Sequence, residues 1–429
     1  MEGKADDRNE KILVQKIQQM FVGIRTYPCA VAFTSAKGNK KRIQSIDLLR
    51  GIVMIIMALD HVRDYFHRDA FLYSPTDLTH TSASIFFTRW ITHYCAPVFV
   101  FLAGISAYLY GTKKTRRELA YYLFTRGIWL VFAELFIISL AWSFNPHYRL
   151  LNLQVIWAIG ISMIVLSGMI YMNRRFILLT AVLLIAGHNL LDTVHVQGTG
   201  AAPFLWSLLH EPGDFIFEQV TIIVRFQVMP WIGIIALGYY FGSLYDSRYN
   251  AGKRRKTLLS VGLTALALFF FLRSFNIYGD ASHWAIQKNN VFSLLSLLNV
   301  TKYPPSLLYI LVTFGPALIF LALAEKPLNA FTEKIAVFGR VPFFYYVIHL
   351  YAIHLLATIA AQISGYKWTS MTSLTDRVNR VPELKGYGFN LLVVYMVWIG
   401  LVLLLYPCCK WFDRYKRSHQ SIHWWLSYL

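Results

Sequence analysis

Long apolar blocks separated by shorter polar segments dominate the chain, a pattern typical of membrane proteins and not of a soluble core. A helix needs roughly 20 mostly apolar residues to cross the hydrocarbon layer of a bilayer. Ten blocks have about this length: 45–66, 90–110, 119–143, 153–172, 176–194, 228–245, 258–275, 306–324, 335–363 and 390–406. Each is expected to be helical, because backbone groups in lipid must be hydrogen-bonded within the protein. The pattern therefore predicts an all-α, polytopic membrane helix bundle with about ten transmembrane helices.

The basic residues predict an orientation for this bundle, because cytoplasmic loops of membrane proteins are enriched in Lys and Arg. In the ten-helix arrangement every dense basic cluster falls on one side: 40–42, 113–117, 174–175, 253–256 and 410–417. We therefore expect both termini in the cytoplasm, a basic N-terminal arm at 1–44, a transmembrane domain at 45–409 and a cytoplasmic tail at 410–429. Topology explains the formal net charge of +19 better than nucleic-acid binding does, since no soluble-looking segment has a basic face with interleaved aromatics.

Two segments outside the blocks have apolar residues of their own. In the N-terminal arm, helical spacing of Leu13, Ile17, Met20, Phe21 and Ile24 indicates an amphipathic helix on the inner surface, or else a solvated, charged anchor. The segment 214–226 contains a short apolar stretch together with charged residues, and is interpreted as an interfacial or re-entrant outer helix. The outer connections, at 68–89, 195–227, 276–305 and 364–389, are longer than most inner ones, which favours function on the outer side.

Ionisable residues are concentrated in the first block. Such residues are costly in a bilayer and usually face the interior of the bundle or a functional path. At about 100° per residue, Asp47, Arg50, His61 and Asp64 fall on one stripe of the helix, with Asp60 at its margin and Arg63 elsewhere. Arg50 lies about 16 Å of helix rise below His61. This spacing suits an anion-binding cation at the inner entrance and a base in the outer half.

Other blocks add candidates for the same site. His93, in the second block, is expected at a depth similar to that of His61, and Asp60 or Asp64 is a candidate to fix the tautomer of either imidazole. In the ninth block Tyr345 and His349 share one helix face, whereas Arg340 and His354 share a nearly opposite one; we favour the face with His349. Structural roles are the alternative: an Asp47–Arg50 ion pair that locks the helix, interface charges, and an interhelical hydrogen bond at His93.

Several sequence segments then become recognisable. RIQSIDLLRGIVMIIMALDHVRD, followed by RWITHYCAPVFVFLAGISAYL, resembles the heparan-α-glucosaminide N-acetyltransferase catalytic-domain family. Softer matches are GRVPFFYYVIHLYAIHLL, KYPPSLLYILVTFGPAL and the terminal WWLSYL. The resemblance implies a transmembrane acyltransferase that moves acetyl groups from cytosolic acetyl-CoA to sugar acceptors across the membrane.

The resemblance also bears on which histidine is the catalytic base. A related group of transmembrane acyltransferases has Asp, Arg and His in this order on its first helix, and Asp47, Arg50 and His61 match that pattern. In the lysosomal enzyme the position that corresponds to His61 resembles Asn, and the catalytic His lies in the following external loop. Here that loop contains His67 and His80 without the surrounding signature. The choice among His61, His80 and His93 therefore stays open.

The predicted function is transfer of an acetyl or acyl group from cytosolic acyl-CoA to a sugar or cell-envelope glycan on the outer side, directly or through an acyl-His intermediate. The predicted catalytic residues are His61, His93, Asp60 and Asp64, and the predicted binding residues are Asp47, Arg50, His349, Tyr345 and Arg340. We expect no metal, because the four cysteines lack metal-ligand spacing. We also expect a bacterial inner membrane location, with a homodimer as one possible assembly. The alternatives are a proton-coupled transporter or flippase, and a noncatalytic scaffold.

Overall fold

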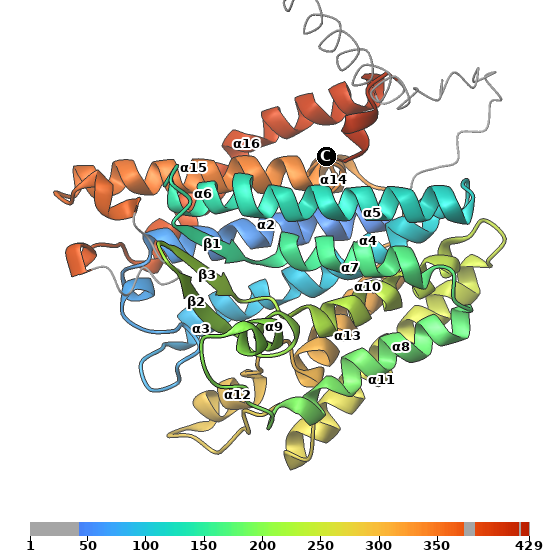
Figure 1. Ribbon diagram of the computed structural model, residues 1–429, viewed down its shortest axis with the longest axis horizontal. Coiled ribbons are helices and arrows are strands. Elements are labelled where there is room, and N and C mark those ends of the chain that lie inside the picture. The colour runs from blue at the N-terminus through green and yellow to red at the C-terminus, as the bar shows by residue number, and fades with distance from the viewer. Residues whose placement is uncertain (1–42, 373–381, 420–421, 429) are drawn as a thin grey trace, which may run out of the picture. The chain divides into compact units, whose positions relative to one another are not determined.

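The computed structural model describes residues 43–372, 382–419 and 422–428, and in this part the chain is mostly helical (Figure 1). Its α-helices are α2 (Gln44–Phe66), α3 (Ala83–Trp90), α4 (Cys95–Gly111), α5 (Arg116–Phe132), α6 (Ser139–Ser143), α7 (Val155–Met169), α8 (Arg174–Ala186), α9 (Ala201–Leu209), α10 (Val228–Gly242), α11 (Ala251–Phe275), α12 (Asn290–Leu298), α13 (Leu307–Leu323), α14 (Ala330–Arg340), α15 (Pro342–Ile363) and α16 (Leu391–His419). The amphipathic helix predicted in the N-terminal arm lies outside the described residues.

Each of the ten predicted blocks contains an α-helix. Within the described residues, six helical stretches are long and apolar enough to cross a membrane: Ala83–Gly111, Arg116–Ser143, Val228–Tyr245, Ala251–Phe275, Pro342–Ile363 and Leu391–His419. Helices α7 and α13 are apolar but shorter. Helix α2 has 23 residues, but it also carries the charged residues of the first block. The chain is thus an integral membrane helix bundle.

A small β-sheet replaces the outer helix predicted at 214–226 and was not expected in an all-α fold. The segment predicted as an outer helix at 214–226 instead forms strands β2 (Gly213–Phe217) and β3 (Val220–Val224), which pair antiparallel. Strand β1 (Leu150–Leu153) pairs parallel with β3, with Leu150 opposite Thr221. The sequence VTIIV of β3 is rich in β-branched residues, which favour strands, and Phe215 and Val224 pack with Leu153 in a small core. The fold is therefore predominantly helical, although the all-α prediction lacked this sheet.

Helix α2 lies inside the bundle, where it contacts α4, α13, α14, α15 and α16. Most of its side chains are buried, including those of Asp47, Asp60, His61 and Arg63. These buried ionisable groups therefore face protein, as expected for charged residues at membrane depth.

Reciprocal glycine contacts hold the main helix pairs together. A Cβ added at Gly51 of α2 would lie 2.1 Å from the carbonyl oxygen of Ile335 in α14, and one added at Gly339 would lie 1.9 Å from that of Asp47. Small residues allow such close backbone approach between membrane helices, where apolar side chains gain little by leaving lipid. The same reciprocity occurs between Gly104 and Gly238, Gly127 and Gly160, and Gly262 and Gly315. The backbones of α2 and α14 are thus fixed in one register.

The two ends of the bundle differ in charge and in loop structure. At one end, Arg174 at the start of α8 lies over the ring of Tyr108 in α4 and donates to the carbonyl oxygen of Tyr240 in α10. The exposed basic residues 113–117, 174–175 and 253–256 gather at the helix ends here, which we call the basic end. The opposite end, called the loop end, carries the sheet and the long connections (Figure 1). Buried Arg273 orders one of these connections by donating to the carbonyl oxygens of Ser282, Ser296, Leu297 and Asn299.

We predict that Gly51→Ala destabilises the protein. The added methyl group would meet the Ile335 backbone, which cannot move without separating α2 from α14. Overpacking of this kind costs about 1–3 kcal/mol. The expected result is a clear fall in the thermal melting midpoint of the purified protein in detergent. The matched control is Gly400→Ala in α16, where an added Cβ meets nothing within 4 Å. Equal melting midpoints for the two variants would contradict the packing argument.

Candidate active site

Two histidines from neighbouring helices form a direct pair in the core of the bundle. Nδ1 of His61 in α2 lies 2.9 Å from Nε2 of His349 in α15, and the two rings stack at 5.1 Å with an angle of 15°. Nδ1 of His349 lies 2.8 Å from the carbonyl oxygen of Tyr345, one helical turn earlier. His349 and Tyr345 are fully buried, whereas His61 keeps 8% of its surface exposed. The helix face that was predicted to carry Tyr345 and His349 thus contacts His61, the predicted base.

The backbone carbonyl sets the direction of hydrogen bonding in this chain. A carbonyl oxygen only accepts, so Nδ1 of His349 must carry the proton. In a neutral His349, Nε2 then accepts, and the donor is the Nδ1–H group of His61. The remaining nitrogen of His61, Nε2, is left with its lone pair. Among the described residues nothing hydrogen-bonds to that nitrogen.

Aromatic side chains border His61. The indole of Trp142 in α6 meets its ring edge-on at 5.1 Å, and the phenol ring of Tyr346 in α15 does so at 6.2 Å. Tyr65 stacks on Trp142 at 5.8 Å and donates its hydroxyl to the Trp142 carbonyl oxygen at 2.9 Å. His61 is therefore bordered by aromatic side chains from α6 and α15.

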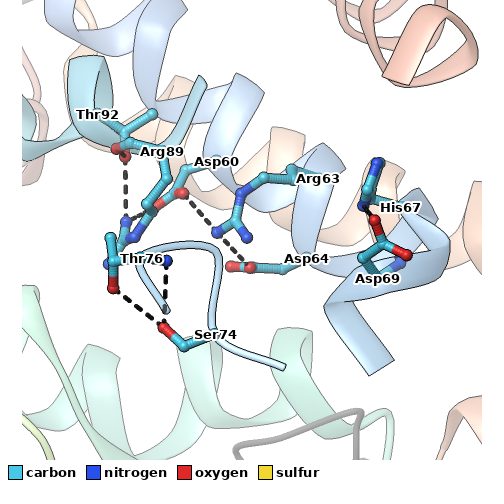
Figure 2. Close-up of polar contacts among 9 residues, drawn as sticks. All are labelled: Asp60, Arg63, Asp64, His67, Asp69, Ser74, Thr76, Arg89 and Thr92. Carbon is cyan, nitrogen blue, oxygen red and sulfur yellow. Dashed lines mark hydrogen bonds and ion pairs between the residues drawn. The ribbon is translucent and has the colours of Figure 1, made fainter. Parts of the chain in front are cut away.

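The two carboxylates predicted to orient a histidine bind arginines instead (Figure 2). Arg63 donates to Asp60 at 2.9 Å and to Asp64 at 2.7 Å. Arg89, at the end of α3, donates to the other oxygen of Asp60 and to Thr92. The cluster holds two carboxylates and two guanidinium groups, so its charges compensate each other. It ties α2 to α3, and it makes no hydrogen bond to His61 among the described residues.

The predicted binding residues Asp47, Arg50 and Arg340 lie towards the basic end. Arg50 Nη1 is 3.7 Å from Asp47 Oδ1. The Arg50 guanidinium also donates to the Gly339 carbonyl oxygen at 3.2 Å and to Ser106 at 2.9 Å. Arg340 donates to Asp413 of α16 at 2.9 Å. The block 335–363, predicted as one helix, is divided between α14, which ends at Arg340, and α15, which starts at Pro342, so Arg340 is not on the helix of His349.

The other candidate histidines are engaged elsewhere. The ring of His93 lies 5.3 Å from that of Tyr309, whose hydroxyl donates to the His93 carbonyl oxygen. His93 has no ring contact with His61 among the described residues, although its own Nδ1 is buried without a partner. In the connection between α2 and α3, His80 is exposed and pairs with Asp77 at 2.9 Å. Hydrogen bonds from Thr79 and His80 lower the pKa of Asp77 to about 2.

His67, the last candidate, follows the end of α2. It is buried, and its Nδ1 accepts a hydrogen bond from the backbone N–H of Asp69 at 3.2 Å. Burial lowers the pKa of His67, so the ring favours its neutral form. This contact is a local cap for the short helix Arg68–Phe71.

A polar cavity of about 200 Å³ lies at the loop end. Its lining includes Asn189, Asp192, His210, Glu211 and Tyr303. The cavity is therefore formed by residues of the connections at the loop end.

Comparison with known protein families identifies the family of this chain. The profile described as heparan-alpha-glucosaminide N-acetyltransferase, catalytic, matches residues 42–278, which is more than half of the 429 residues. The chain belongs to this family. A search of curated proteins finds no match. The family and the apolar helices together identify a membrane acetyltransferase.

Sequence reasoning missed several polar groups of this acetyltransferase. Glu134, in the π-helical segment Ala133–Ile138, is fully buried and accepts from the backbone N–H of Trp157 at 2.8 Å. An acidic residue inside an apolar block was the available signal. The carboxylate lies at the start of α7, where it compensates unpaired N–H groups, so its role is structural. Arg89 and Trp142 had no comparable signal, because arginines and aromatic residues are common near block ends, and Tyr346 is one of many aromatic residues in its block.

We predict that Asp60→Asn destabilises the acetyltransferase. The substitution leaves Arg63 and Arg89 in a buried site with one charge partner fewer. Breaking a buried ion pair typically costs about 3–5 kcal/mol. Thermal melting in detergent measures the effect, with Glu218→Gln in the exposed turn between β2 and β3 as control. That control is expected to change stability by no more than about 0.5 kcal/mol. If both variants melt like the unmodified protein, the cluster is not the structural element described.

Proposed function

We propose that the chain transfers an acetyl group from acyl-CoA, supplied at the basic end, to an amine or hydroxyl of a sugar or glycan that arrives at the loop end. His61 acts as the general base. The observation that carries this proposal is the hydrogen-bonded chain from the Tyr345 carbonyl through His349 to His61, in a member of an acetyltransferase family. It leaves one imidazole nitrogen ready to accept a proton.

The proposed topology has ten spans over 45–409, with both termini and the 1–44 and 410–429 segments in the cytoplasm. The gathering of exposed Lys and Arg at the basic end supports this orientation. A bacterial inner membrane fits the same orientation. In this arrangement the basic end faces the compartment that contains acyl-CoA.

The donor is proposed to dock at the basic end because its phosphates are anionic. Arg50, next to Asp47 and Ser106, marks the inner entrance, about 16 Å of helix rise from His61. The acyl thioester then reaches the bundle core, while the nucleotide stays near the exposed basic residues. The polar cavity at the loop end is the proposed entrance for the acceptor, since polar side chains such as those of Asn189 and His210 line it.

The proposed reaction is a direct transfer. As the acceptor nitrogen or oxygen attacks the thioester carbonyl carbon, Nε2 of His61 takes the proton of the acceptor. The C–S bond then breaks, and the CoA sulfur leaves with that proton, returned by the His61 imidazolium. His349 holds His61 in the productive tautomer, and the Tyr345 carbonyl does the same for His349. Asp60 and Asp64 keep the neighbouring arginines in place instead of sharing the proton.

We predict that His61→Ala abolishes transfer. Removing a general base lowers kcat by about 10²- to 10⁴-fold. The assay uses purified protein in liposomes with labelled acetyl-CoA and glucosamine as trial acceptor, and it records both CoA release and labelled product. His349→Ala is expected to lower kcat by at least about tenfold, because His61 loses the partner that fixes its tautomer.

The control for both variants is His147→Ala, at an exposed position of the loop end. It is expected to keep full activity. Full acetyl transfer by His61→Ala would overturn the assignment of the base. Uptake of intact acetyl-CoA by the liposomes, without CoA release by the unmodified protein, would overturn the enzymatic function in favour of transport.

A further inference from the structure

Two unpartnered hydrogen-bond donors border the proposed base. The indole Nε1 of Trp142 and the hydroxyl of Tyr346 are both buried polar atoms without a hydrogen-bond partner. Both side chains contact the ring of His61 edge-on, at centroid distances of 5.1 Å and 6.2 Å. The indole of Trp142 lies within side-chain hydrogen-bonding reach of the Tyr346 hydroxyl, but the two groups do not have the geometry of a normal hydrogen bond. A buried donor without an acceptor is unfavourable, so this pair needs a physical explanation.

The surrounding residues fix both donors. Tyr65 stacks on the indole of Trp142 and donates to its carbonyl oxygen, which anchors the backbone of α6 at this point. Tyr346 follows Tyr345 directly in α15, and its ring meets His349 edge-on at 5.5 Å. Tyr346 is 3% exposed. The helix that holds the histidine relay therefore also positions one of the donors.

We propose that the Trp142 indole N–H and the Tyr346 hydroxyl form a binding site for the carbonyl oxygen of the acyl thioester. This inference rests on the proposed function. When the acceptor attacks the carbonyl carbon next to His61, negative charge develops on the carbonyl oxygen. Fixed donors in a site without water stabilise that charge and need no reorganisation. Neither donor gives up its proton: the charge returns to a C=O double bond when the C–S bond breaks.

The site explains why the donors are left unpaired in the free protein. A protein acceptor at this position would occupy the space needed by the carbonyl oxygen. Other buried donors without partners occur in the described residues, including the hydroxyl of Tyr245 near the basic end. The Tyr245 ring lies under Arg254 at 5.1 Å, and Tyr245 has no ring contact with His61. What distinguishes Trp142 and Tyr346 is that both border the same base.

The test is Tyr346→Phe in the full chain, which removes a single oxygen atom. Loss of one oxyanion donor lowers kcat by about 10²- to 10³-fold in enzymes that use such sites. We expect a kcat for CoA release reduced about 100-fold, a KM for acetyl-CoA nearly unchanged and a melting midpoint equal to or above that of the unmodified protein. The midpoint does not fall, because deleting an unpartnered buried hydroxyl removes a desolvated group and no hydrogen bond.

The matched control is Tyr245→Phe, which also removes a buried, unpartnered hydroxyl and should leave kcat unchanged. Trp142→Phe is the second variant and should lower kcat in the same way. An unchanged kcat in Tyr346→Phe, or a kcat that falls together with the melting midpoint, would overturn the proposal. If His61→Ala is inactive while Tyr346→Phe keeps full kcat, the assignment of His61 as the base is retained and the proposed carbonyl-binding site is rejected. If His61→Ala stays active, the proposed function itself fails.

Discussion

The contact on which the rest of the structure depends is the backbone approach of α2 and α14 at Gly51 and Gly339. Helices in lipid gain little from burying apolar side chains, so close packing through small residues must determine their register. His61 follows Gly51 by ten residues, and His349 follows Gly339 by ten residues. Gly339 lies on α14 and His349 on α15, which starts two residues after α14 ends, so the contact at Gly51 also fixes where the helix of His349 begins. A slip of one residue at the glycines would separate the two imidazoles.

Electrostatics divide the interior into a part that holds structure and a part suited to chemistry. Asp60, Arg63 and Arg89 compensate one another, and removing one partner leaves an uncompensated buried charge, so this cluster is a scaffold. The pair of His61 and His349 is different, because it needs no net charge to satisfy its internal hydrogen bond. Its outer nitrogen remains available. In the proposed reaction, this separation lets His61 accept a proton without disturbing the ion pairs that hold α2 to α3.

Much of this organisation follows from the sequence, for identifiable reasons. Apolar length predicts the helical blocks, and helical periodicity predicts that His61 and His349 face the interior. The contact between the two histidines is not predictable in this way, because it depends on the register of helices far apart in the chain. The strands at 213–224 were missed because a short apolar stretch does not distinguish a strand from a helix. Arg89 was missed as the partner of Asp60 because it lies just before a block, where an interface charge is ordinary.

The use of a carbonyl instead of a carboxylate behind the histidine pair has a chemical consequence. A carboxylate at the position of the Tyr345 carbonyl would stabilise an imidazolium strongly in a buried site, because opposite charges attract most where water is excluded. A neutral carbonyl orients His349 without supplying that charge. In the proposed reaction the imidazolium exists only between proton uptake from the acceptor and proton return to the CoA sulfur. A weakly stabilised imidazolium releases its proton readily, so the carbonyl suits a base that must be neutral again at the end of each transfer.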